Sequence, residues 1–275
     1  MNSNKRIDLI CRLILLFFIF VTIYPVFFVV ITAFKSTQEF YTNIWFLPRQ
    51  IAWANFPKAW ITAHIGEYTL HSVIVVVSTV VGNLIVSTMA GYALSRLYVP
   101  FAKTILFLII FVLMLPSEFT IMPLYLSMAK WKLLDSHLTL IIPYIGWGLP
   151  MAIYIFKNFF DTIPNELIEA GRIDGASETR TFVQIVVPLM LPALGTVSIF
   201  SFVGAWGELL CAQIALGTTS KIRTIPMGIV AFQQQFSVDW GPLSASICIV
   251  LIPLVVVFLF LQKYFIRGLT GGSIK

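Results

Sequence analysis

Charge is scarce in this sequence, and the scarcity excludes most classes of soluble protein. Only 11% of its 275 residues are Asp, Glu, Lys or Arg, while 59% are hydrophobic. A soluble domain has about 25% charged residues, and a water-soluble fold of this size could not cover so much apolar surface. Several apolar runs reach the roughly 20 residues that cross the hydrocarbon core of a bilayer, which predicts an all-α polytopic membrane protein.

Residues that carry chemistry are also few. Three cysteines lie far apart, each in or beside an apolar run, and are interpreted as packing residues: Cys11, Cys211 and Cys248. Three scattered histidines are interpreted as loop or interface residues: His64, His71 and His137. No lysine follows a glycine, so the phosphate-binding G-x-x-x-x-G-K-[ST] loop is missing, as are H-E-x-x-H and G-x-S-x-G. The sequence therefore predicts neither an enzyme nor a resident cofactor or metal.

Hydropathy divides the chain into six predicted transmembrane helices, at residues 13–34, 70–94, 104–126, 138–156, 185–210 and 243–262. The predicted organisation is an N-terminal segment 1–12, a first helix 13–34, a connection 35–69, a five-helix core 70–266 that includes a loop at 157–185, and a tail 267–275. Eleven Lys and Arg residues fall on the side of the termini and seven on the other, which predicts cytoplasmic termini and an extracytoplasmic 35–69 segment. The net charge of +6 is interpreted as this orientation signal and not as a nucleic-acid footprint.

Small residues and prolines mark the predicted helices. Ser87, Gly91 and Ser95 recur every four residues, which predicts a stripe where another helix approaches closely. Seven prolines lie inside or at the edges of the predicted spans and are expected to bend or interrupt them: Pro116, Pro123, Pro143, Pro150, Pro188, Pro192 and Pro253.

Polar side chains inside the predicted spans are candidates for the lining of a solute pathway, because such residues are costly in lipid. Glu118 follows the kink expected at Pro116, and Glu208 lies in the stretch GAWGELL. Both are predicted to lie near the outer half of the membrane, so a carboxylate that reaches interfacial water is an equal alternative. The candidate pathway residues are Asn83, Glu118, Trp206 and Glu208. No ladder of Asp, Glu and His indicates a proton relay, which disfavours an ion-coupled secondary transporter.

The predicted loop at 157–185 is unusually acidic, with five of the chain's 12 carboxylates between Asp161 and Glu178. Thr162 is expected to cap a short amphipathic helix over 164–172, and Gly175 to form a turn. Ser177 is expected to cap a second helix that continues into the fifth span. Three apolar residues are predicted to share one face of the first helix: Ile163, Leu167 and Ile168. Such a short helix needs a surface to lie on, although a simple solvated loop is the alternative.

The stretch EAGRIDGASETRTFVQIVVP, residues 169–188, resembles the EAA loop of ATP-binding cassette importer permeases. That pattern is E-A-A, three residues, G, nine residues and I-x-L-P, and the spacing agrees at every position. Gly171 replaces the second alanine and Val187 the leucine, changes expected to preserve the loop and soften the short helix.

The resemblance extends over nearly the whole chain. AFKSTQEF, AGYALSR, IMPLY, IPNELIEAGRIDGAS and FIRGLTGGSIK are similar, in order, to landmarks of carbohydrate-type permeases such as the smaller membrane subunit of the maltose importer. One departure is at the end of the fifth span, where the family often has W-N-E-F. Here Trp206 and Glu208 are kept, but Gly207 replaces the asparagine.

The resemblance implies a type I importer permease fold with a cytoplasmic coupling helix, in a bacterial inner membrane. The implied partners are a second, non-identical permease, two ATP-binding cassette subunits that hold ATP and Mg, and an extracytoplasmic solute-binding protein, with membrane lipid around the helices. The implied cargo is a sugar or oligosaccharide, with another polar solute as the alternative. The residues expected to couple to the ATPase are Ile163, Leu167, Ile168, Glu169, Ala170, Gly171, Asp174, Gly175, Ile185 and Pro188.

Overall fold

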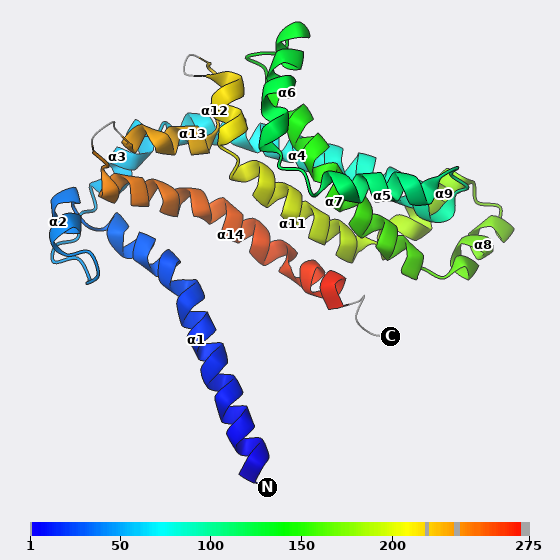
Figure 1. Ribbon diagram of the computed structural model, residues 1–275, viewed down its shortest axis with the longest axis horizontal. Helices are drawn as coiled ribbons and strands as arrows, with labels where there is room; N and C mark the ends of the chain where they lie inside the picture. Colours follow the sequence, from blue (N-terminus) through cyan, green and yellow to red (C-terminus); the bar gives the residue numbers. More distant parts are fainter. Residues whose placement is uncertain (1, 218–219, 234–236, 271–275) are drawn as a thin grey trace. The chain divides into compact units, whose positions relative to one another are not determined.

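The computed structural model describes residues 2–217, 220–233 and 237–270. The described residues form helices joined by turns, with one isolated bridge between Gln233 and Val238. The chain divides into two compact units: Met1–Glu67 with Gly228–Ile252, and Tyr68–Met227 with Pro253–Lys275. Two long helices, α4 (Ile65–Arg96) and α14 (Trp240–Thr270), contribute residues to both (Figure 1).

In the described part of the chain, four helices are long and apolar enough to cross a membrane: Asp8–Ala33 within α1 (Asn2–Ala33), all of α4, all of α7 (Leu138–Thr162) and Trp240–Tyr264 within α14. A fifth span results if the bent pair Glu178–Leu189 and Leu191–Trp206 counts as one. The prediction of a helical, multi-pass membrane protein is confirmed.

The third predicted span, 104–126, is not one helix. It consists of α5 (Ala102–Val112) and α6 (Glu118–Lys130), separated by residues 113–117. Proline removes a backbone donor and collides with the preceding turn of a helix, and Pro116 lies at this break. Just before it, the amides of Met114 and Leu115 bond three residues back, at 3.0 and 3.1 Å, instead of four. The count of six spans therefore stays a prediction.

The fifth predicted span is also interrupted. The chain passes from α9 (Glu178–Thr181) through a π-helical turn, η1 (Phe182–Val186), and α10 (Val187–Leu189), and then bends by 76° into α11 (Leu191–Trp206). Pro188 and Pro192 stand on either side of the bend at Met190. The helical path after Ser177 does lead into this predicted span, and the bend agrees with the expectation that Pro188 and Pro192 bend or interrupt it.

In the first unit, a buried lysine ties the end of α1 to its neighbours. Lys35 Nζ donates to the carbonyl oxygens of Asn43, at 2.7 Å, and Ile44, at 2.9 Å, just after α2 (Thr37–Thr42). Asn55, the first residue of α3 (Asn55–Thr62), donates to the carbonyls of Ala33 and Lys35, both at 2.8 Å. The unit also contains η2 (Val230–Phe232) and part of α13 (Ile225–Ile229).

In the second unit, α4 and α7 run in the same direction and pack closely. A Cβ on Gly91 would lie 2.8 Å from Phe156 Cβ, so only glycine permits this approach. Further along the stripe, Ser95 Oγ donates to Asp161 Oδ1 at 2.7 Å. The predicted small-residue stripe is therefore confirmed as a helix contact. On another side of α7 lies α11 (Figure 1).

Candidate functional site

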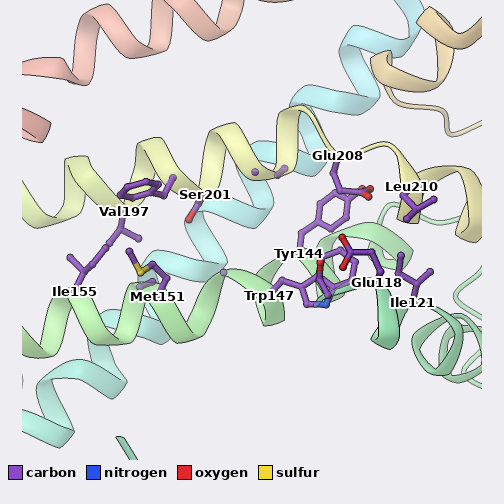
Figure 2. A pocket seen from close by; sticks show the side chains of 16 residues that line it. Glu118, Ile121, Tyr144, Trp147, Met151, Ile155, Val197, Ser201, Glu208 and Leu210 are labelled. Atoms are coloured by element: carbon purple, nitrogen blue, oxygen red, sulfur yellow. The ribbon is translucent and has the colours of Figure 1, made fainter. Parts of the chain in front are cut away.

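A cavity of about 380 Å³ lies in the second unit, between α6, α7, α11 and the start of α12 (Leu210–Leu216) (Figure 2). Its size falls in the range of about 300–1,000 Å³ typical of small-molecule sites. We call it the α6–α7–α11 pocket. It is lined by Ser117, Glu118, Ile121, Tyr144, Trp147, Gly148, Met151, Ala152, Ile155, Val197, Phe200, Ser201, Gly204, Ala205, Glu208 and Leu210.

The pocket has a polar and an apolar end. Figure 2 shows Met151, Ile155 and Val197 together at one end. At the other end lie two carboxylates and two aromatic rings: Glu118, Tyr144, Trp147 and Glu208. Such a lining suits a solute with both apolar faces and polar groups.

The carboxylate of Glu208 forms its hydrogen bonds with groups of the protein itself. It accepts hydrogen bonds from the Tyr144 hydroxyl at 2.5 Å and from the backbone amides of Cys211 and Ala212 at 2.7 and 3.1 Å. These are orphan amides of the first turn of α12, so Glu208 caps that helix. Burial, followed by the nearby Glu208, raises the pKa of the Cys211 thiol to about 12. Cys211 therefore stays a protonated packing residue, as interpreted from the sequence.

The other two groups at the polar end, Trp147 and Glu118, differ in how they are held. Trp147 is held by a hydrogen bond from its Nε1 to Thr120 Oγ1, at 2.9 Å, and by stacking on Tyr144, with ring centroids 5.8 Å apart and planes at 30°. Glu118, in the first turn of α6, is exposed and has no hydrogen-bond or ionic partner among the described residues.

Of the four candidate pathway residues, the structure brings Glu118 and Glu208 together and places the other two elsewhere. Asn83 is buried between α4 and α7, where its Nδ2 donates to the Ile145 carbonyl at 3.4 Å. Trp206 is buried and stacks on Phe202, with centroids 5.4 Å apart.

Sequence reasoning missed Tyr144 and Trp147. Residues three apart on a helix share a face, so an aromatic pair at that spacing inside a predicted span is the signal that could have identified them.

A second candidate region is the connection between α7 and α11. α7 ends at Thr162, and α8 covers Asn165–Ile173. The Thr162 hydroxyl donates back to the Phe159 carbonyl at 2.7 Å, so Thr162 belongs to α7 and does not cap α8. The predicted helix over 164–172 is confirmed to within one residue at each end.

The turn after α8 is built as predicted. Gly175 has a φ of +77°, a left-handed conformation that costs glycine little. The amide of Ala176 reaches back to the Gly171 carbonyl at 2.9 Å, which closes the end of α8. Ser177 Oγ then accepts the Arg180 amide at 3.3 Å and caps α9.

The predicted apolar face of α8 is divided between two directions. Ile163 and Ile168 are buried in a cluster with Phe156, Phe160 and Val186, so they fasten the connection to its own chain. Leu167 is 43% exposed. The expectation that these three residues share one face that is free to contact the ATPase is wrong. Ile163 and Ile168 are buried against α7 and η1, and only Leu167 remains exposed.

The outward surface of α8 carries a different set of residues, which we call the outer ridge: Glu166, Leu167, Glu169, Ala170 and Ile173. Ile173 is 86% exposed, an unusual value for a large aliphatic side chain. Asp174, which follows, is also exposed. The ridge is thus a small apolar strip flanked by carboxylates.

At Gly171, where the EAA pattern has alanine, a Cβ would lie 2.7 Å from Ile185 Cδ1 and 3.4 Å from Thr181 Oγ1. The nearer atom is the end of a flexible side chain, so a small shift of Ile185 would accommodate an alanine there. Ile185 is the residue of η1 that lies against this position of α8. Pro188 lies in α10, two residues before the bend at Met190.

Arg96, the last residue of α4, fastens the same connection. Its guanidinium donates to the carbonyls of Phe160 and Ile163 and to Asn165 Oδ1. Phe160 lies in the last turn of α7, Ile163 directly follows that helix, and Asn165 begins α8. One side chain therefore fixes the angle between α7 and α8, and we call this contact the Arg96 clamp.

The structure also pairs two histidines that the sequence left separate. His71 Nδ1 and His137 Nε2 lie 3.0 Å apart, which links α4 to the residue before α7. Within residues 2–217, 220–233 and 237–270, no three His, Cys, Asp or Glu side chains gather where they could hold a metal ion.

Comparison with known proteins agrees with these features. A family model described as "Binding-protein-dependent transport system inner membrane component" matches residues 82–271. The chain is 30% identical to the diacetylchitobiose uptake system permease protein NgcG of Streptomyces coelicolor, over 100% of this chain and 91% of that one. It is 29% identical to the melibiose/raffinose/stachyose import permease protein MelC of Bacillus subtilis, over 90% of each. The fold matches a chain of a bacterial ABC transporter that imports alginate, with a TM-score of 0.82, 21% identity, and coverage of 96% of this chain and 98% of that one.

Proposed function

Because this chain belongs to the family of inner membrane components of binding-protein-dependent transport systems, we propose that it imports a sugar or oligosaccharide as the permease subunit of an ATP-driven importer. The observation that carries the cargo class is that relatives aligned along nearly the full chain are named for the uptake of diacetylchitobiose and of melibiose, raffinose and stachyose. A pocket with stacked aromatic rings and a free carboxylate suits the same class. In this function the chain forms half of the pathway beside a second, non-identical permease.

The proposal assigns ATP hydrolysis to partner chains. The sequence has no phosphate-binding loop, so two cassette subunits supply hydrolysis, and ATP and Mg bind there. A solute-binding protein on the outer side delivers the sugar. The termini and α8 then lie on the cytoplasmic side, as the distribution of Lys and Arg predicts.

Coupling to the cassettes is assigned to the outer ridge of α8. The ridge has the composition of a protein contact, with Leu167 and Ile173 exposed beside the carboxylates of Glu166, Glu169 and Asp174. Ile163 and Ile168 hold α8 on its own chain from the other side. A cassette that binds the ridge and moves would therefore move α7 and η1 with it.

The first experiment is purification of the complex from native membranes. An ATPase and a second permease should copurify, and in the presence of the binding protein a saccharide should stimulate hydrolysis. Stimulation by another polar solute, with no response to saccharides, would move the cargo to the alternative class. Absence of any ATPase partner from a transporting complex would refute the function.

The second experiment tests the outer ridge. We expect Ile173→Glu or Glu169→Lys to leave membrane insertion intact and to release or uncouple the cassette. The matched control is Tyr98→Glu, which places a charge on a 95% exposed aromatic residue in the loop after α4. Equal cassette retention and equal sugar-stimulated hydrolysis in the ridge variants and the wild type would remove α8 from the coupling path.

A further inference from the structure

We propose that the α6–α7–α11 pocket is a saccharide-binding subsite, in which one face of a sugar ring stacks on Trp147 and its hydroxyls donate to Glu118. The inference rests on the proposed function and adds that this chain itself holds the cargo, instead of leaving recognition to the partner permease. The site is carried by the geometry at the polar end of the pocket (Figure 2).

Trp147 is placed as a platform. Its only donor, Nε1, is already bonded to Thr120 Oγ1, so the ring has no unmet polar group. Tyr144 stacks beside the indole, and the partly exposed Trp147 side chain lines the pocket, where a ligand can reach it. The C–H groups on the less polar face of a pyranose suit such a surface, because the aromatic face carries partial negative charge.

The two carboxylates have separate tasks. Glu208 accepts three hydrogen bonds within the protein and caps α12. Glu118 lines the same end of the pocket, is exposed and has no partner in the described part of the chain. An ionised carboxylate only accepts hydrogen bonds, so Glu118 matches the vicinal hydroxyl donors of a sugar. Ser117 and Ser201 add hydroxyl groups to the lining.

The same residues fit a neutral sugar better than an organic cation. Aromatic sites for quaternary cations surround the charge with several ring faces. Here the lining has three aromatic rings, Tyr144, Trp147 and Phe200, and two of them, Tyr144 and Trp147, stack on each other instead of facing a common centre. The apolar end, with Met151, Ile155 and Val197, extends the surface for the less polar side of a second sugar ring.

The test measures sugar binding to the assembled importer, reconstituted without the binding protein, by equilibrium dialysis. The probes are labelled melibiose and labelled N,N'-diacetylchitobiose, with labelled choline as the cationic probe. We expect one or both sugars to bind wild-type protein. Trp147→Ala should weaken binding about tenfold or more, while Trp147→Phe, which keeps an aromatic face, should lose only about threefold. Glu118→Gln should lose about tenfold or less, since an amide still accepts one hydrogen bond.

The control is Trp131→Ala, which removes an exposed tryptophan at the end of α6, outside the pocket. Sugar affinity unchanged in Trp147→Ala, or lowered equally in the control, overturns the subsite. Binding of choline that Glu118→Gln abolishes overturns it in favour of a cation site. If the wild-type importer transports a saccharide but these variants transport it with unchanged affinity, the subsite fails and the proposed function stands. If no saccharide is transported at all, the proposed function fails.

Discussion

The Arg96 clamp should determine how much motion of α8 reaches the rest of the chain. Its guanidinium is half-buried and makes three charge-assisted hydrogen bonds, to Phe160, Ile163 and Asn165. Such bonds contribute about 1.5–3 kcal/mol each and are not additive. A working value for the whole clamp is about 3 kcal/mol, which corresponds to about two orders of magnitude in the population of the fixed α7–α8 angle.

Replacing Arg96 with Gln should therefore loosen the connection without removing α8. We expect the assembled importer to hydrolyse ATP but to move about tenfold less sugar per ATP. Without the clamp, part of the cassette motion would bend the chain at Ile163, between α7 and α8, instead of moving α7. Arg96→Lys should be intermediate, since an ammonium group keeps the charge near the end of α7 but loses the planar fork that reaches several acceptors. The assay is sugar uptake and ATP hydrolysis, measured together in proteoliposomes.

A matched control is Lys103→Gln, which removes an exposed cation from the first turn of α5. It should keep the wild-type ratio of sugar to ATP. The reasoning is refuted if Arg96→Gln keeps the wild-type ratio of sugar to ATP. It is also refuted if Arg96→Lys and Arg96→Gln lower that ratio equally, because retaining the positive charge would then have no effect on coupling.

Three further predictions concern backbone and pairing. Gly91→Leu should destabilise the chain by about 2–4 kcal/mol in denaturant unfolding, because its Cβ would meet Phe156 at 2.8 Å and a larger side chain must separate α4 from α7; Gly91→Ala should cost less. Gly175→Val should uncouple ATP hydrolysis from sugar transport, whereas Gly175→Asn should keep most of the coupling, since asparagine adopts positive φ far more readily than valine. Equal loss of coupling in both variants would contradict this. Burial, and then the adjacent His71, holds the pKa of His137 below its ordinary 6.5. The folded state, which favours neutral His137, therefore has its full stability above about pH 6.5 and loses stability as the pH falls through the lowered pKa. The thermal midpoint should drop over that interval in the wild type and less in His137→Asn.

Local features of the connection could be predicted because they depend on a few neighbouring residues. Gly175 and Ser177 were identified from turn and cap chemistry alone, and the structure shows a positive φ at the first and a capping hydroxyl at the second. The stripe through Gly91 was likewise visible as a four-residue repeat. In each case the backbone conformation or the approach of a helix admits very few residue types, so the residue itself reveals the structure.

Features that depend on distant parts of the chain could not be predicted. Periodicity placed Ile163, Leu167 and Ile168 on one side of a helix, but only the position of η1 decides that Ile168 is buried and Leu167 exposed. Apolar residues continue across the break at 113–117, although α5 is more apolar than α6, so the separation of the two helices depended on how strongly Pro116 acts in context. The His71–His137 pair joins residues 66 apart, and no local pattern records it.

The pocket and the clamp are connected through α7. Trp147 and Asp161 are 14 residues apart on that helix, or about 21 Å along its axis, and α4 is fastened beside it at Gly91, at Ser95 and by Arg96. α4 and α7 should therefore move together when α8 is displaced. Glu118 belongs to α6, which is separated from α5 by the break at 113–117. The hydrogen bond from Trp147 Nε1 to Thr120 Oγ1, two residues from Glu118, joins α6 to α7 at the pocket. A displacement at α8 that moves α7 should therefore carry Trp147 and Glu118 together, and the two groups proposed to hold the sugar should stay side by side.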